Sequence, residues 1–565
     1  MLSRRRFIAT GAAAGALVAV PPSLAQDHAG APDNPITPGD LAAAERVQGI
    51  AHSREARERM LPDVNDRLQR FAAIRDAGLT NDVPPALTFD LSLSPEPRPA
   101  PGPGFEFQAP GIQRAAGDDL AYAGVARLSA MISSGAISSV ELTRFFLDRL
   151  RRLDPQVKAV VTLTEARALQ KAEEMDRELS AGINRGPLHG IPYGAKDLLA
   201  VRGYPTTDGV AMFADREHDF DAAAIQRLDA AGAVLVAKLS LGELAWGDVW
   251  FGGMTRNPWN LDQGASGSSA GPGAAVAAGM VPFAIGSETL GSIVSPSTRN
   301  GVTGLRPTFG RVSTRGAMAL SWSMDKLGPM TRSALDAAIV MEALRGPDPE
   351  ARDQTEDPAF PFEMSMHLSG MRVGYLADAF ASGEGAGGDA DRRTLQHLRD
   401  LNADLTPVTL PDDVPAAALL IILEAEAGAA FDGITRSSAV DGMVRQERYA
   451  WPNVFRHARH IPAVDYINAN RHRTRLMQRM AVVFESIDLL VMPSFGNLGL
   501  AIGNLTGHPA VVVPNALLPI DNHPERRNPR SITFVGPLWK DHLPLMAAHA
   551  LQAVTDWHSR RPPLR

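Results

Sequence analysis

The stretch that decides the fold is GASGSSAGPGAAVAAGMVPFAIGSETLGSI, residues 264–293. It is rich in glycine and contains five serines, a single carboxylate and no Cys, His or Lys. Its segment MVPFAIGS, 280–287, is typical of a short buried strand. A serine hydroxyl is a poor nucleophile unless a base lies beside it. These serines therefore either pack a tight backbone or depend on a base from elsewhere in the chain.

Outside this stretch, apolar strands and amphipathic helices alternate. Short apolar runs predict further buried strands at 232–238, 489–495 and 509–514. Helical spacing of apolar residues predicts helices at 138–154, 164–179 and 334–346. This alternation is typical of an α/β layered fold. The part from about 350 to 480 is predicted to be mostly helical and irregular.

The composition is that of an ordinary globular enzyme and excludes several kinds of site. The chain has 565 residues, 45% of them hydrophobic, and a net charge of -7 without a long basic run, which argues against nucleic acid and membrane-surface partners. The absence of Cys excludes thiol nucleophiles, Cys-ligated metals and disulfides. The nearest histidine pair, His457 and His460, is interpreted as a solvated helix face rather than a metal site. We expect no metal and no cofactor.

The N-terminus has the features of an export signal. Residues 1–25 contain an Arg run at Arg4, Arg5 and Arg6, an apolar stretch too short to span a bilayer, and small residues before a cleavage position. The segment resembles the twin-arginine signal of bacteria. It predicts a periplasmic or secreted protein with no membrane contact after signal removal. A disordered basic tail is the alternative.

Three further segments follow the signal. Helical patterns fill residues 26–90 and predict a helical N-terminal extension. Residues 91–117 are rich in proline and predict an extended connector that wraps over the main domain. The main domain is predicted over residues 118–565.

Lysine is scarce, and one lysine has the surroundings of a general base. Of the 56 Lys and Arg residues only six are Lys. Lys196 lies among apolar neighbours in HGIPYGAKDLLAVRG, where burial would favour the neutral amine, although a pair with Asp197 would oppose this. A neutral amine can accept a hydroxyl proton. An alternative pattern, the nucleophile elbow in GSSAG at 267–271, is weak because its central Ser269 follows an apparent loop.

Three blocks resemble the amidase signature family of serine hydrolases. These are GIPYGAKD at 190–197, SGSSAGP at 266–272, and GSETLGSIVSPSTRNGVTGLRPTFGRVS at 286–313. SWSMDKLGPMTRS, 321–333, and NLTGHPAVVVP, 504–514, also fit. The resemblance covers the chain from about residue 118 to its end. It implies the family's α/β fold, a central twisted mixed sheet with helices on both faces.

The resemblance also implies a Ser-Ser-Lys triad. Ser292 matches the nucleophile, Ser268 the bridging serine that follows a cis peptide bond, and Lys196 the general base. The two serines are 24 residues apart, as in the family. By the same resemblance the oxyanion is bound by backbone N–H groups of Thr289, Leu290, Gly291 and Ser292. Ser269 is expected to support the network, whereas Ser266 and Ser287 are interpreted as plain loop residues.

Three positions depart from the family pattern. Leu290 replaces a usual Gly and would be strained if the position required a positive φ. Glu288 stands where Asp is usual. Val294 replaces a usual Arg, so that a partner for Glu288 is missing or supplied elsewhere, with Arg299 as a candidate. These departures affect the loop geometry and the substrate preference rather than the triad.

The leading functional prediction is an exported amidase that hydrolyses a small-molecule amide through an acyl-enzyme on Ser292. The alternatives are an esterase or carbamate hydrolase with the same triad, and a catalytically silent binding protein. Related family members form the glutamine-hydrolysing subunit of tRNA amidotransferase complexes, a role that an export signal argues against. The oligomeric state is open, with a homo-oligomer as one option. Aromatic residues that would either shape an apolar substrate pocket or pack in the core are Trp246, Trp250, Phe251, Trp259, Trp322 and Trp451.

Overall fold

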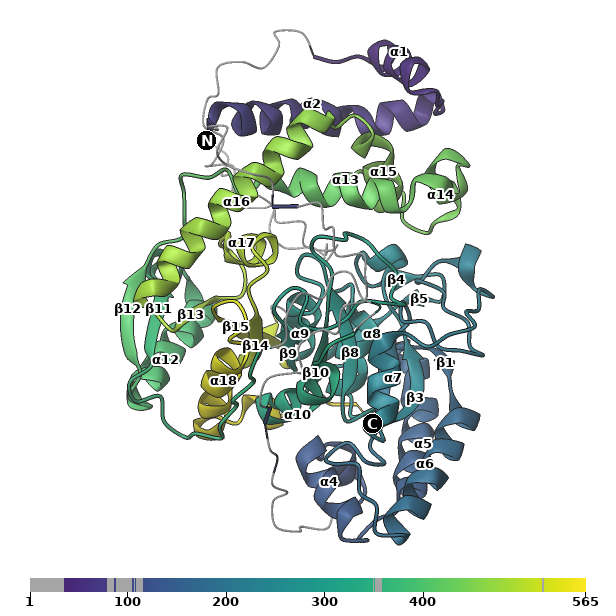
Figure 1. Cartoon of the computed structure of the whole chain (residues 1–565), viewed down its shortest axis with the longest axis vertical. Helices are drawn as coiled ribbons and strands as arrows, with labels where there is room; N and C mark the ends of the chain where they lie inside the picture. Colours follow the sequence, from purple (N-terminus) through teal and green to yellow (C-terminus); the bar gives the residue numbers. More distant parts are fainter. Residues whose placement is uncertain are drawn as a thin grey trace.

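An eleven-stranded mixed sheet forms the centre of the molecule (Figure 1). The computed structural model describes residues 35–78, 86–87, 104–105, 107, 115–348, 350, 358–520 and 523–564. From one edge of the sheet to the other, the strands are β1 (Val160–Leu163), β3 (Val234–Leu239), β2 (Pro192–Lys196), β8 (Ala284–Glu288), β10 (Lys326–Thr331), β9 (Thr303–Arg306), β14 (Ala510–Ile520), β15 (His523–Val535), β13 (Leu489–Pro493), β11 (Arg372–Leu376) and β12 (Asp404–Val408).

Parallel and antiparallel pairs both occur in this sheet. Strand β2 pairs in parallel with β3 and β8, and β11 pairs in parallel with β12 and β13. The pairs from β8 through β10, β9, β14 and β15 to β13 are antiparallel, as is the pair of β1 with β3. The expected α/β fold with a central mixed sheet is confirmed.

Helices cover both faces of the sheet, because side chains alternate between two cores. In β3, Val234 and Val236 join one core and Leu235 joins the other. The first core is completed by α5 (Ser139–Val157), α6 (Glu165–Ser180) and α8 (Ala270–Ala277). The second is completed in this half of the sheet by α4 (Val125–Ser133), α7 (Ala223–Ala230) and α10 (Ala334–Leu344). Strands buried on both faces explain the uninterrupted apolar runs in the sequence.

The segment predicted to be mostly helical and irregular, from about 350 to 480, also contains two strands. Strand β11 pairs with β13, and β12 closes the edge of the sheet. The segment is mostly helical, as predicted, but the prediction missed these two strands; β12 gave no signal because its sequence DLTPV includes a proline and no apolar run. The stretch before Ser268, interpreted as a loop, likewise contains a small hairpin of β6 (Arg256–Asn257) and β7 (Asn260–Gly264).

A helical layer lies beyond the sheet at the top of Figure 1. It is built from α13 (Ile421–Ala430), α15 (Trp451–Ala458) and α16 (Ala463–Ser486), and is covered by α1 (Pro38–Gln48) and α2 (Arg54–Asp76). Arg67 of α2 reaches into this layer, where it forms an ion pair with Glu424 and a hydrogen bond to the carbonyl of His457. His457 is buried, so the interpretation of a solvated face was wrong for this residue.

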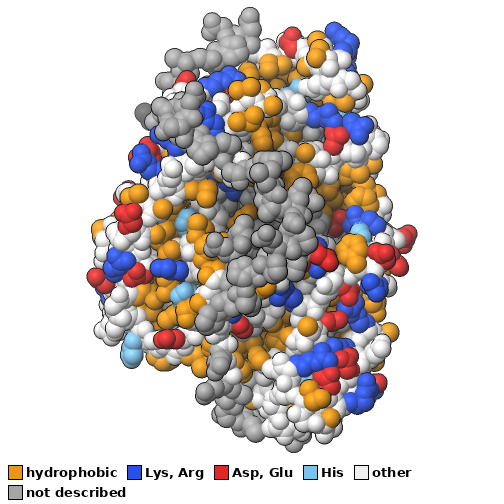
Figure 2. Space-filling model, in the orientation of Figure 1, with side chains coloured by type: hydrophobic (Ala, Val, Ile, Leu, Met, Phe, Trp, Pro, Cys, Tyr) orange, Lys and Arg blue, Asp and Glu red, His pale blue; other side chains and the backbone are white. Residues whose placement is uncertain are grey.

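Two further helices, α12 (Gly385–Asp400) and α18 (His542–Val554), pack on the sheet beside β14, and the other remaining elements are short. The other helices are α3 (Asp118–Ala121), α9 (Val294–Asn300), α11 (Ala377–Ala381), α14 (Asp432–Arg436) and α17 (Gly499–Leu505). Strands β4 (Val249–Trp250) and β5 (Gly253–Met254) form a further two-stranded sheet. In the described part of the chain, no helix combines the length and the apolar character needed to cross a membrane. Basic and acidic side chains are interspersed on the face shown in Figure 2.

The predicted signal, residues 1–25, lies outside the described residues, and so does most of the predicted connector. Of the connector, Phe105 packs edge-on against Phe362 with ring centroids 5.0 Å apart. Its backbone N–H donates to the carboxylate of Glu342 over 3.1 Å. The described part of this segment therefore lies on the main domain.

Candidate active site

Lys196, the last residue of β2, is completely buried and surrounded by hydroxyl groups. Its Nζ lies 2.8 Å from Ser268 Oγ, 3.0 Å from Ser269 Oγ and 2.8 Å from Ser287 Oγ. Burial lowers the pKa of Lys196 well below its ordinary value, and the distant charges of Asp325 and Glu288 only partly oppose this. The arrangement favours a neutral amine that is hydrogen-bonded to serines.

Asp197, the neighbour that would have kept Lys196 charged, is paired with another lysine. Its carboxylate lies 2.7 Å from Nζ of Lys238, on the adjacent strand β3, and accepts hydrogen bonds from the N–H and hydroxyl of Thr207. Successive side chains of a strand point to opposite faces, which separates the two adjacent residues. The charge at Asp197 is therefore compensated away from the serines.

The serines that meet Lys196 come from two segments of the opening stretch. Ser268 follows a cis peptide bond from Gly267, as the resemblance implies, and Ser269 is the residue just before α8, at its N-cap position. Ser269 Oγ also donates to the carbonyl of Ser287 over 3.0 Å and accepts from its N–H over 3.1 Å. Ser269 has no exposed surface and all these hydrogen bonds hold it in place, which excludes the elbow interpretation of Ser269 as an exposed nucleophile.

Two serines interpreted as plain loop residues have defined contacts. Ser287 lies in β8 and contacts Lys196 directly, so that interpretation was wrong. Ser266 Oγ lies 2.7 Å from Ser295 Oγ, and its N–H donates to Asp248. The alternation of side chains along the predicted strand could have identified Ser287 as an inward-facing residue. It follows the buried Ile285 by two residues and therefore lies on the same face of β8.

Glu288 holds both ends of the loop that carries Ser292. Its Oε2 accepts hydrogen bonds from the N–H groups of Ile293 and Val294 over 2.8 and 2.9 Å. Its Oε1 accepts a hydrogen bond from Arg306 Nη1 over 2.9 Å. Burial would raise the pKa of Glu288, but Arg306 and these hydrogen bonds lower it to about 2. The expectation that Arg299 supplies the charge partner was wrong: the partner is Arg306, from β9.

The backbone of this loop explains why Leu290 is tolerated. The positive φ of 87° falls on Gly291, not on Leu290, whose side chain packs against the main core. A side chain at Gly291 would also approach Leu500 to 3.2 Å. The N–H groups of Thr289, Leu290, Gly291 and Ser292 donate to no acceptor among the described residues. Four neighbouring donors are thus available beside Ser292.

The side chain of Thr289 is held by the carboxylate of Asp325, a residue that the sequence analysis did not single out. Its hydroxyl donates to Asp325 over 2.6 Å, and the same carboxylate accepts the N–H groups of Leu320 and Ser321. Burial raises the pKa of Asp325 to about 6. Asp325 lies within SWSMDKLGPMTRS, one of the segments with the family pattern, and that was the available signal.

Ser292 itself is partly exposed, unlike Ser268 and Ser269. Its carbonyl accepts the N–H of Ser269 over 3.1 Å, which ties the two serine segments together. Within the described residues its hydroxyl makes no hydrogen bond, so the contact between Ser268 and Ser292 stays a prediction. The structure brings Lys196, Ser268 and Ser269 together and places Ser292 next to them through the backbone.

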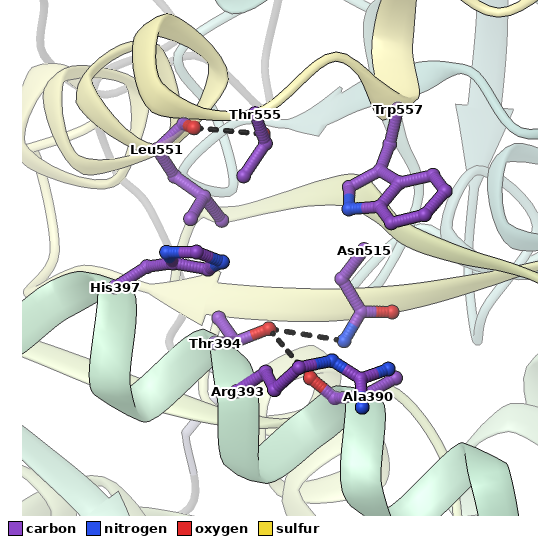
Figure 3. A pocket seen from close by; sticks show the side chains of 8 residues that line it. All are labelled: Ala390, Arg393, Thr394, His397, Asn515, Leu551, Thr555 and Trp557. Carbon is purple, nitrogen blue, oxygen red and sulfur yellow. Dashed lines mark hydrogen bonds between the residues drawn. The ribbon is translucent and has the colours of Figure 1, made fainter.

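A cavity of about 420 Å³ adjoins this cluster, with Ser287 and Thr289 in its wall. A second cavity, of about 180 Å³, lies between α12, β14 and α18 (Figure 3). It shares no lining residue with the first, and Figure 3 shows two of its polar side chains, Thr394 and Thr555, bound to neighbouring carbonyls. In the described residues no group of His and carboxylate side chains has a geometry that could hold a metal ion.

Comparisons with known proteins identify the family of this chain. The Amidase family model matches residues 141–542. The chain is 34% identical over 489 residues to a glutamyl-tRNA(Gln) amidotransferase subunit from Roseiflexus castenholzii, covering 78% of this chain and 97% of that protein. It is similar to the crystal structure of a peptide amidase from Stenotrophomonas maltophilia, with a TM-score of 0.68, 29% identity, and coverage of 78% and 98%.

A further solved structure, from a vestigial protein complex related to an s-triazine catabolic enzyme, has a TM-score of 0.69 and 28% identity. It covers 76% of this chain and 98% of the other. The matched region contains the whole Lys196 cluster and leaves the N-terminal extension outside the family model. This chain belongs to the amidase signature family of hydrolases that act on C–N bonds.

Proposed function

We propose that this chain is an exported amidase that cleaves its substrate through an acyl-enzyme on Ser292. The observation that supports this most strongly is the buried, hydroxyl-bound amine of Lys196, which contacts Ser268 Oγ at 2.8 Å. A buried lysine with no carboxylate in contact is suited to accept a proton rather than to carry one. Family membership and the accessible Ser292 support the same role.

The proposed reaction uses these groups one after another. Ser292 Oγ attacks the carbonyl carbon, its proton passes to Ser268, and the Ser268 proton passes to Lys196 Nζ. The developing oxyanion is bound by the loop N–H groups, and each such donor is worth about 3 kcal/mol in the transition state. The same proton then returns through Ser268 to the leaving nitrogen as the C–N bond breaks. Water repeats the relay to release the carboxylic acid and regenerate Ser292.

The first test is Ser292→Ala, which removes the attacking oxygen. We expect amide turnover to fall by at least about 10³-fold and labelling by a fluorophosphonate to disappear. The exposed Ser437→Ala variant is the matched control and should retain both. Turnover near the wild-type rate in Ser292→Ala would contradict the proposal, and an unlabelled wild-type protein would favour a silent binding protein.

Two parts of the proposal need separate experiments. Matched amide, ester and carbamate substrates with the same acyl group distinguish an amidase from an esterase or carbamate hydrolase. Export is supported by the Arg run at residues 4–6 and the apolar segment that follows. Cell fractionation of the full-length chain should recover the protein in the periplasm or medium. Retention in the cytoplasm, alongside export of a known twin-arginine cargo, would contradict it.

A further inference from the structure

The cavity beside the catalytic cluster has mainly apolar walls. Among its lining side chains are Leu198, Met318, Leu320, Trp322 and Leu327, and the cavity also includes Ser287 and Thr289 of the reaction loop. Because Ser287 and Thr289 belong to the segment just before Ser292, a group held against these walls would lie beside the reaction loop. A volume of about 420 Å³ suits a group of the size of a substituted ring.

The charged residues around this cavity are already engaged with the protein. Arg315 forms ion pairs with Asp348 over 3.0 Å and with Glu350 over 3.3 Å. Lys326 Nζ donates to the carbonyl of Met324, and Asp325 accepts the hydrogen bonds described above. Displacing Asp348 or the groups bound to Asp325 would cost a buried or half-buried interaction, whereas the pair with the exposed Glu350 contributes little. The cavity therefore offers apolar contact rather than a counter-ion.

Trp322 is the large apolar side chain in this wall that the protein itself leaves uncovered, with 57% of its surface exposed. Its two neighbours are fixed by one carboxylate of α13. Glu426 accepts the hydroxyl of Ser321 over 2.6 Å, and both the hydroxyl and the N–H of Ser323, over 2.7 and 3.1 Å. The backbone on either side of the indole is thus held rigidly while the ring remains open to a ligand.

The other aromatic residues named in the sequence analysis do not lie in the wall of this cavity. The indoles of Trp246, Trp250, Trp259 and Trp451 are buried, and Phe251, although 37% exposed, packs edge-on against Trp250. None of these five lines the cavity. Large rigid aromatic side chains supply much contact area at a low cost in conformational entropy.

We propose that Trp322 forms the specificity wall of a substrate subsite, and that the enzyme prefers amides bearing a neutral aromatic or bulky aliphatic group. This rests on the proposed amidase function for catalysis, whereas binding to the subsite does not require turnover. Charged amides of the same size bind less well, because the described residues that line the cavity offer them no free counter-ion.

Binding is measured by isothermal titration calorimetry on the full-length Ser292→Ala protein, so that the ligand is not consumed. The probes are 3-phenylpropionamide, N-benzylacetamide and acetamide, which place the ring on the acyl side, on the amine side, or nowhere. We expect at least one ring-bearing amide to bind at least tenfold more tightly than acetamide. Adding Trp322→Ala should remove about tenfold of that difference, and Trp322→Phe should restore most of it.

Tyr449→Ala is the matched control, since Tyr449 has a similar exposure of 55% and lies outside the cavity. It should leave all three affinities within about twofold. The proposal is overturned if neither ring-bearing amide binds better than acetamide, or if Trp322→Ala leaves the difference intact in a protein with unchanged thermal unfolding. Ring-selective binding that depends on Trp322, without turnover by the wild type, would defeat the amidase function and retain the subsite.

Discussion

Two buried lysines on neighbouring strands show how contacts decide the role of an amine. Lys196 on β2 and Lys238 on β3 both have no exposed surface, and burial lowers the pKa of each. Lys238 contacts the Asp197 carboxylate at 2.7 Å, whereas among the described residues Lys196 contacts only hydroxyls and a carbonyl. Desolvation is common to both, so the carboxylate makes the difference. One lysine is an internal ion and the other a candidate base.

The largest effect should come from replacing Lys196. Lys196→Met and Lys196→Arg are both expected to lower kcat by about 10³-fold, because methionine has no base and arginine does not lose its proton. For Lys196→Met the free energy of unfolding should change by less than about 1.5 kcal/mol, since the swap conserves volume and strands no buried charge. Steady-state kinetics and thermal unfolding measure the two. Substantial activity in Lys196→Arg would contradict the base role.

The same substitution at Lys238 should lower folding stability strongly and activity only weakly. Lys238→Met leaves Asp197 buried without its cation, which costs about 3–5 kcal/mol of folding stability. The fraction that remains folded should keep activity much closer to wild type than Lys196→Met does. Chemical denaturation and active-site titration with a fluorophosphonate give the two quantities. Equal losses of activity in both variants would break the comparison.

The pH dependence of kcat/KM tests the assignment of Lys196 as the general base, with a smaller expected change in rate than the substitutions. The neutral form of Lys196 is the active one, so activity is lost as pH falls through the pKa of this lysine. Burial lowers that pKa, which places the rise in kcat/KM well below 10.5, the ordinary lysine value. Below it the rate should fall about tenfold per pH unit. The rise should persist in folded Lys238→Met, and a flat profile from pH 5 to 9 would count against the base.

The local motifs predicted most of the fold and the chemical cluster. The apolar runs that became β3, β8, β13 and β14 are buried on both faces, so their sequence signal is strong. The contact of Lys196 with Ser268 followed from the matched blocks. Strand β12 was not predicted because an edge strand needs no apolar run.

The features that the sequence missed depend on residues far apart in the chain. Arg306 reaches Glu288 because β9 and β8 both border β10, and no spacing rule encodes that neighbourhood. Ser287 ends the predicted strand 280–287, but only the pairing of β8 with β2 brings its hydroxyl to Lys196. The engagement of Asp197 by Lys238 likewise required the register of β2 against β3. Tertiary pairing, rather than local propensity, selects these partners.

The insertion of Arg67 into the helical layer has a consequence for the boundary of the working enzyme. Glu424 is nearly buried, and the cations paired with it, Arg67 and Arg70, both come from α2. A shortened protein that begins at the family-matched region would strand this acid and uncover the apolar side chains beneath α2. The helices of the extension are thus part of the folded enzyme. Proteolytic maturation that leaves a stable product must cut the chain upstream of them.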